Sequence, residues 1–133
     1  MSKPVFDFLA ANQVFYLATL EGNQPRVRPF GFNLVENNRL YFITGGSKNV
    51  ARQLHANPRF ELSTANAKGE WLRLAATAVF DTTPELLEKA FQHMPPLRER
   101  YGKPDSPKVE MFYASQVVAT LEDMNGRKDV YNF

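Results

Sequence analysis

The chain has 133 residues, no cysteine, and 16 lysine and arginine residues against 14 aspartate and glutamate residues. This length suits a single domain, 1–133, and is too short for a TIM barrel or a two-domain dehydrogenase. The lack of cysteine excludes disulfides and thiolate metal sites, and two histidines cannot form a three-histidine zinc site, so we predict no metal centre.

Charge and hydropathy patterns also limit the partners. No apolar stretch reaches about 18 residues, the length that a membrane-spanning helix needs. The first residues, MSKPVFDFLAAN, make a poor signal peptide because polar residues interrupt them. No run of like charges marks a nucleic-acid-binding tail. We therefore expect a cytoplasmic protein with no membrane segment and no nucleic-acid partner.

The first half of the chain alternates helices with strands. Apolar residues at helical spacing predict a helix over 3–12. Stretches rich in β-branched and aromatic residues, separated by short turns, predict strands over 14–20, 25–35 and 39–44. Two glycines end the third strand, and Ser47 is the expected N-cap of a helix over 48–56.

The second half continues the same alternation. Asn57-Pro58 ends the second helix, and strands are predicted over 60–64 and 71–80. Thr83 followed by a proline starts a third helix, which reaches about residue 94. The basic segment 97–107 is expected to be a loop. The chain then forms a strand or a bent pair over 109–121, and Asn125-Gly126 predicts a type I′ turn before a short last strand.

Short turns between consecutive strands favour antiparallel pairing. The predicted fold class is α+β and mainly antiparallel β. The strands, six to seven in number, are expected to form a closed or partly closed barrel with flanking helices.

Two stretches can carry a binding function. Strand alternation places Arg26, Arg28, Phe30 and Phe32 on one face, which suits an anionic ligand with a flat ring; a solvated face with two arginines is the alternative. The stretch 43–49 joins a strand to a helix start through two glycines. Free N–H groups, hydroxyls and a lysine there suit a phosphate, although an ordinary capped helix is equally compatible.

Other candidates are weaker. Trp71 can stack on a ring at the mouth of a barrel or simply belong to the core. His55 and His93 are single histidines without a catalytic arrangement around them. Because no nucleophile–base or paired-carboxylate pattern stands out, an enzymatic reaction would depend on a cofactor.

Taken in order, three stretches resemble the pyridoxamine 5′-phosphate oxidase-like family of FMN-binding split β-barrels, from about residue 14 to residue 121. They are VFYLATLEGNQPRVRPFGF, LYFITGGSKNVARQL followed by HANPRFEL, and GEWLRLAATAVF. Within that family the chain is similar to the small general-stress-protein and nitroimidazole-reductase-like branch. The resemblance implies a single FMN-binding split-barrel domain and a homodimer with the cofactor at its interface.

The resemblance also implies the cofactor-binding residues. Those along the flavin ring would be Arg26, Val27, Arg28 and Pro29. Those around the phosphate end would be Ile43, Thr44, Ser47, Lys48 and Asn49, and Trp71 would approach the cofactor, from the neighbouring subunit if not from its own. The end of the chain, Asp129 to Phe133, lacks the basic, histidine-containing motif of the vitamin B6 oxidases, so oxidation of vitamin B6 is not expected.

The function that follows is that of an FMN-dependent oxidoreductase, a reductase of a small-molecule substrate with NAD(P)H as one candidate electron donor. The alternatives are a non-catalytic flavin or haem protein for storage or sensing and, less favoured, a small barrel that binds single-stranded nucleic acid. The sequence does not distinguish FMN from the deazaflavin F420 or from haem.

Overall fold

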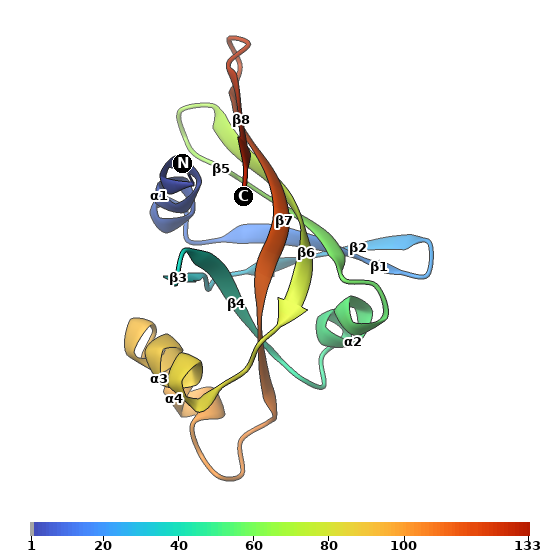
Figure 1. Cartoon of the computed structure of the whole chain (residues 1–133), viewed down its shortest axis with the longest axis vertical. Helices are drawn as coiled ribbons and strands as arrows, with labels where there is room; N and C mark the ends of the chain where they lie inside the picture. Colours follow the sequence, from blue (N-terminus) through green and yellow to red (C-terminus); the bar gives the residue numbers. More distant parts are fainter. Residues whose placement is uncertain (1) are drawn as a thin grey trace.

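The computed structural model describes residues 2–133, which form four helices and eight strands (Figure 1). In chain order these are α1 (Lys3–Ala11), β1 (Phe15–Glu21), β2 (Gln24–Phe30), β3 (Leu34–Glu36), β4 (Arg39–Gly45), α2 (Asn49–Ala56), β5 (Arg59–Ala65), β6 (Glu70–Phe80), α3 (Pro84–His93), α4 (Pro96–Tyr101), β7 (Val109–Asp123) and β8 (Lys128–Asn132).

All strands belong to one antiparallel sheet. Seven of them follow the order β2-β1-β5-β6-β7-β4-β3, and β8 pairs with β7. Across the described residues the two ends of this order, β2 and β3, do not pair, so the sheet is a split barrel rather than a closed one. The predicted α+β split-barrel class is confirmed, with eight strands in place of the expected six to seven.

Strand alternation builds the core on one face of the curved sheet. In β1 the inward side chains of Phe15 and Leu17 are fully buried, and in β6 Leu72 and Leu74 are as well. The helix α1 completes this core with Val5 and Leu9. A smaller cluster around Phe32, Tyr41 and Met111 lies under α3.

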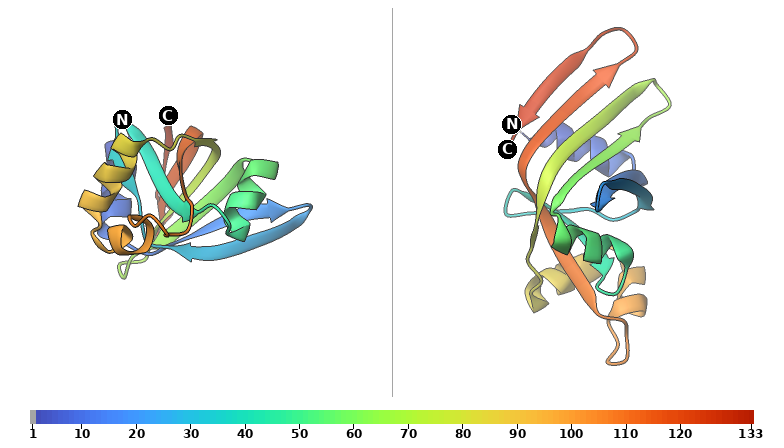
Figure 2. Two further views of the ribbon diagram at one scale, coloured as in Figure 1. Left: turned by 90° about the horizontal axis from the view of Figure 1, so that it is seen from below. Right: turned by 90° about the vertical axis from the view of Figure 1, so that its right-hand side faces the viewer.

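Two long strands set the shape of the molecule. In Figures 1 and 2, β6 and β7 run along it, with α3 and α4 near one end and the β7–β8 turn at the other. The strand β7 bends at a bulge, where Gln116 has a φ of 50° and the register against β6 shifts. Of the two predicted alternatives over 109–121, a strand or a bent pair, the structure has the single strand, with this bend within it.

The predicted strand 25–35 is wrong as a single element. It ends at Phe30, and β3 begins only at Leu34. Pro29 lacks an N–H and Gly31 lacks a side chain, so neither favours a continued ladder. The connection 31–33 carries the chain from one edge of the sheet to the other and buries Phe32 on the way.

One expected helix boundary and one expected loop also differ from the structure. Ser47 is not the N-cap of α2: Lys48 occupies that position and no side chain caps the helix. Ser47 lies within a turn that the Lys48 N–H closes on the Gly45 carbonyl at 3.1 Å. The expected loop 97–107 is wrong over its first half, where α4 extends from Pro96 to Tyr101 and Leu97 packs against the smaller cluster.

The prediction of a type I′ turn at Asn125-Gly126 is wrong, and a turn with that backbone occurs between β3 and β4 instead. Asn125 does not have the positive φ that such a turn requires, and the Asp123 carboxylate instead accepts hydrogen bonds from the Asn125 and Arg127 N–H groups at 2.8 and 3.0 Å. The two-residue connection between β3 and β4 has the required backbone, with φ of 52° at Asn37 and 58° at Asn38. Thr83 caps α3 as predicted, accepting from the Leu86 N–H.

Candidate functional site

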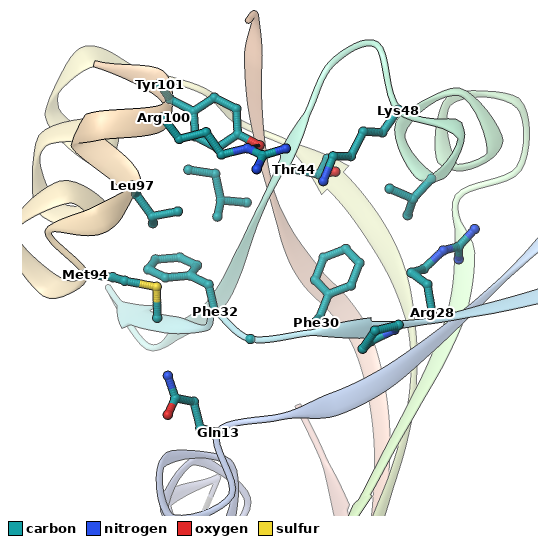
Figure 3. A pocket seen from close by; sticks show the side chains of 14 residues that line it. Gln13, Arg28, Phe30, Phe32, Thr44, Lys48, Met94, Leu97, Arg100 and Tyr101 are labelled. Atoms are coloured by element: carbon teal, nitrogen blue, oxygen red, sulfur yellow. Dashed lines mark hydrogen bonds between the residues drawn. The ribbon is translucent and has the colours of Figure 1, made fainter. Parts of the chain in front are cut away.

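A cavity of about 380 Å³ opens where the end of β2, the strand β4, the start of α2 and the segment from α3 to α4 meet (Figure 3). We call it the first cavity. The residues that line it are Gln13, Arg28, Pro29, Phe30, Gly31, Phe32, Ile43, Thr44, Lys48, Val50, Met94, Leu97, Arg100 and Tyr101. Most of the wall is apolar, and the polar groups lie mainly on the side of α2 and α4.

The end of β2 and the connection that follows it provide the aromatic part of the wall. Arg28, Phe30 and Phe32 all face the first cavity, as the sequence pattern predicts, and Figure 3 shows the two phenyl rings rising from the same stretch of chain. Arg26 shares this side of β2 but does not reach the cavity. Its guanidinium instead pairs with the Glu21 carboxylate, with Nη2 3.0 Å from Oε1.

Neutral oxygen atoms hold the Arg28 guanidinium. Its Nη1 donates to Thr19 Oγ1 at 2.7 Å, and its Nη2 donates to Gln53 Oε1 at 2.6 Å. The Thr19 hydroxyl in turn donates to Gln53 Oε1 at 2.6 Å, and both of these side chains are buried. Partial burial lowers the pKa of Arg28 below its ordinary value. The network fixes the direction of the guanidinium without neutralising its charge.

Two further cations border the cavity without a carboxylate partner. Among the ion pairs formed within residues 2–133, none includes Arg28, Lys48 or Arg100. Lys48 precedes α2, and the Arg100 Nε donates to the hydroxyl of Tyr101 at 3.1 Å. Arg28 is half-buried, whereas Lys48 and Arg100 are exposed at the rim of the cavity. Positive charges without carboxylate partners raise the local electrostatic potential, so this side of the cavity favours an anionic ligand.

The turn between β4 and α2 lies against α4. A Cβ on Gly45 would make ordinary contacts, 3.4 Å from Lys48 Cγ and 3.5 Å from the Tyr101 hydroxyl. The Gly46 N–H donates to the carbonyl of Lys108 at 2.8 Å, which ties the turn to the residue before β7. Gly45 thus lies between Lys48 and Tyr101, which form one polar corner of the cavity.

The structure brings together half of the predicted site residues within one chain. Arg28, Pro29, Ile43, Thr44 and Lys48 line the first cavity. Ser47 and Asn49 are exposed beside it, and the Asn49 amide oxygen accepts from Arg52. Val27 points from the opposite face of β2, where it is 68% exposed.

Trp71 lies at the other end of the long strands. It pairs with Glu122 of β7, whereas Thr44 of the cavity pairs with Glu110 of the same strand. At the rise of an extended strand these two positions are on the order of 30–40 Å apart. Within one chain Trp71 therefore does not reach the first cavity.

The sequence prediction missed the helical side of the cavity. This side consists of Met94, which follows α3, and of three residues of α4 at helical spacing, namely Leu97, Arg100 and Tyr101. This spacing was the available signal, but the prolines and charges of the segment favoured a loop. Thr19 and Gln53 were missed because nothing local shows that two polar side chains will be buried against Arg28.

Neither histidine lines the first cavity. His55 Nε2 lies 3.0 Å from Glu110 Oε1, and the ring stacks on Phe80 with centroids 3.9 Å apart. His93 meets Phe32 edge to face at 5.8 Å. In the part of the chain that the structure describes, no group of three histidine or acidic side chains could hold a metal, and no helix is long and apolar enough to cross a membrane.

Comparisons with known proteins identify one family model and several similar solved structures. The family model described as pyridoxamine 5′-phosphate oxidase matches residues 1–123. The crystal structure of a NimC/NimA family protein from Clostridium acetobutylicum has 34% sequence identity and a TM-score of 0.91, covering 98% of this chain and 91% of that one. A comparison with curated protein sequences found no match.

Two more distant structures share the fold. A pyridoxamine 5′-phosphate oxidase-related, FMN-binding protein from Nostoc punctiforme has 17% identity and a TM-score of 0.63, covering 98% of this chain and 95% of that one. A haem-binding protein from Mycobacterium smegmatis has 19% identity and a TM-score of 0.71, covering 92% of this chain and 54% of that one.

The network around Arg28 makes a stability prediction. Gln53→Leu removes the acceptor of two hydrogen bonds while keeping a similar volume, so it should lower the free energy of unfolding by about 1–3 kcal/mol. Urea denaturation measures this change. The matched control is Gln92→Leu on α3, where the exposed amide donates only to Glu88. Equal stability of the two variants would show that the Gln53 contacts do not hold Arg28 in solution.

Proposed function

Because the chain belongs to the pyridoxamine 5′-phosphate oxidase family, we propose that it is a flavoprotein that binds FMN in the first cavity and reduces a small-molecule substrate. The observation that carries the proposal is the combination of three cations without carboxylate partners and an apolar, aromatic wall in one cavity. FMN has the matching parts, an anionic phosphate and a flat ring system.

The residues present fit such a cofactor. Lys48 and the start of α2 would hold the phosphate, since N–H groups and positive charge meet there. Phe30, Phe32 and Ile43 would contact the ring and exclude water from it. Arg28 would provide a fixed positive charge, because its direction is already set by Thr19 and Gln53. When bound, FMN supplies electron transfer between a donor, for which NAD(P)H is our candidate, and the substrate.

Vitamin B6 phosphate esters are not the substrates that we propose. The residues 128–133 pair with β7 or pack beside it: the Phe133 N–H donates to the Val117 carbonyl at 3.2 Å, and its ring meets that of Phe6 at 5.5 Å. None of them lines the first cavity in the described chain. Within one chain, residues 128–133 therefore contribute no group to that cavity.

The outer face of the sheet supports a homodimer as the working form. Register places Val27, Ala18, Glu61, Ala75 and Val118 in a row across five strands, with Val27 68% and Val118 49% exposed. Tyr16 and Val130 add exposed apolar surface to the same face. Trp71 also points outward there, so a second copy packed on this face is the route by which Trp71 could approach a cofactor bound to its neighbour.

Haem binding is the alternative function, because the similar structure from Mycobacterium smegmatis is that of a haem-binding protein. Haem requires an axial ligand, and the first cavity has no histidine among its described lining residues. The absorption spectrum of the purified protein separates the two cases. Flavin bands after addition of FMN support the proposal, whereas a Soret band that disappears in His93→Ala or His55→Ala would replace it with haem binding.

A single charge placed against Arg28 tests the cofactor site. Gln53→Glu puts a carboxylate where the amide oxygen now lies, 2.6 Å from Nη2, and so neutralises Arg28 internally. We expect FMN affinity to fall roughly tenfold or more, as measured by quenching of flavin fluorescence.

The control for this measurement is Gln24→Glu, which makes the same charge change at an exposed position of β2. It should leave FMN affinity unchanged. The proposal fails if the parent protein does not bind FMN, or if Gln53→Glu binds it as tightly as the parent does.

The dimer has its own test. Val27→Glu should convert the protein from a dimer to a monomer in sedimentation equilibrium, because an interface does not tolerate an unpaired buried charge. Ala11→Glu introduces the same charge on the exposed side of α1 and should leave the dimer intact. A parent protein that is monomeric, or a Val27→Glu variant that remains dimeric, would exclude this face as the interface.

A further inference from the structure

A second cavity, of about 610 Å³, lies next to the first. It is bounded by α1, by the connection between β2 and β3, and by the end of α3. The two cavities share Gln13, Gly31 and Met94 in their walls. The two cavities are therefore neighbours that meet along these three residues.

Gly31 lies on the boundary between the two cavities, and its lack of a side chain leaves open space there. A Cβ built on this glycine meets no other atom within 4 Å, and its φ lies outside the left-handed region. The backbone thus does not require glycine here, and the missing side chain leaves free space instead. Phe32 lines the first cavity and His93 lines the second, and their rings are in edge-to-face contact across the boundary.

The charges of the two cavities differ. Of the described residues that line the second cavity, only Lys3 and Asp7 carry full charges, and they neutralise each other, with Lys3 Nζ 2.6 Å from Asp7 Oδ2. The first cavity, by contrast, has cations without carboxylate partners. A phosphate or carboxylate is therefore favoured in the first cavity. In the second cavity Lys3 is already paired with Asp7, so it does not attract an anion in the same way.

The remaining lining of the second cavity suits a small organic molecule. Phe6, Leu9 and Leu34 provide apolar contact, and the amide side chains of Gln13 and Asn33 provide hydrogen-bond donors. A few polar groups in a mainly apolar wall are typical of sites that orient a small ligand.

We propose that the second cavity is the substrate compartment, and that it selects small, uncharged molecules with hydrogen-bond acceptors, which meet the cofactor of the first cavity at the boundary beside Gly31. This inference rests on the proposed function for the role of the first cavity. The binding preference of the second cavity can be measured whether or not FMN binds.

The test uses two ring-matched probes, naphthoquinone and naphthoquinone sulfonate, which differ by one negative charge. The lack of cysteine removes thiol addition to the quinone ring. Calorimetric titration of the FMN-loaded protein should show naphthoquinone binding roughly tenfold or more tightly than the sulfonate. The same titration without FMN separates the two proposals, because the second cavity should keep its preference even if the cofactor assignment fails.

Two alanines of α1 provide matched variants. Ala10 lines the second cavity, whereas its exposed neighbour Ala11 does not. Ala10→Phe should weaken naphthoquinone binding roughly tenfold or more and leave FMN affinity unchanged, and Ala11→Phe should change neither.

Three results would overturn the inference. The first is that naphthoquinone does not bind the parent protein. The second is that the sulfonate binds as tightly as the uncharged ring. The third is that Ala10→Phe and Ala11→Phe bind naphthoquinone equally, which would locate its site elsewhere on the molecule.

Discussion

The half-buried guanidinium of Arg28, held only by neutral oxygen atoms, is the interaction on which the account of this protein depends. Thr19 and Gln53 give it direction, and within the described chain no carboxylate gives it charge balance. An arginine placed in this way is prepared for an anion before the anion arrives. The aromatic wall beside it favours a ligand that is flat as well as anionic. FMN, the cofactor that we propose, has both properties.

The split of the sheet creates the place where these features meet. Because β2 and β3 lie at opposite ends of the strand order, the chain between them crosses the open side of the barrel and presents Phe30, Gly31 and Phe32 to α3 and α4. A closed barrel would bury these residues in a ladder. The same opening gives two compartments of different charge on either side of Gly31, which suits a cofactor with a phosphate and a substrate without one.

Much of this arrangement could be predicted from residue patterns. Period-two alternation correctly placed Arg28, Phe30 and Phe32 together, and the glycine turn before Lys48 correctly marked a corner of the cavity. What could not be predicted depends on contacts between distant segments. The hydrogen bond between Arg28 and Gln53 joins β2 to α2. The position of α4 depends on Leu97, which packs against a cluster that other strands and α3 form. Arg26 matched the local pattern as well as Arg28 did, and only the position of Glu21 across the hairpin diverts it.

The most direct test of the central claim compares two ligands that differ only in the phosphate. Fluorescence titration with FMN and with riboflavin measures how much the cations of the first cavity contribute. If Arg28 and Lys48 bind the anionic end of the ligand, FMN should bind on the order of tenfold to a hundredfold more tightly than riboflavin, and the difference should shrink as salt is added. Equal affinity for the two ligands at low salt would contradict the account, because it would show that the uncompensated charge of this cavity does not select its ligand.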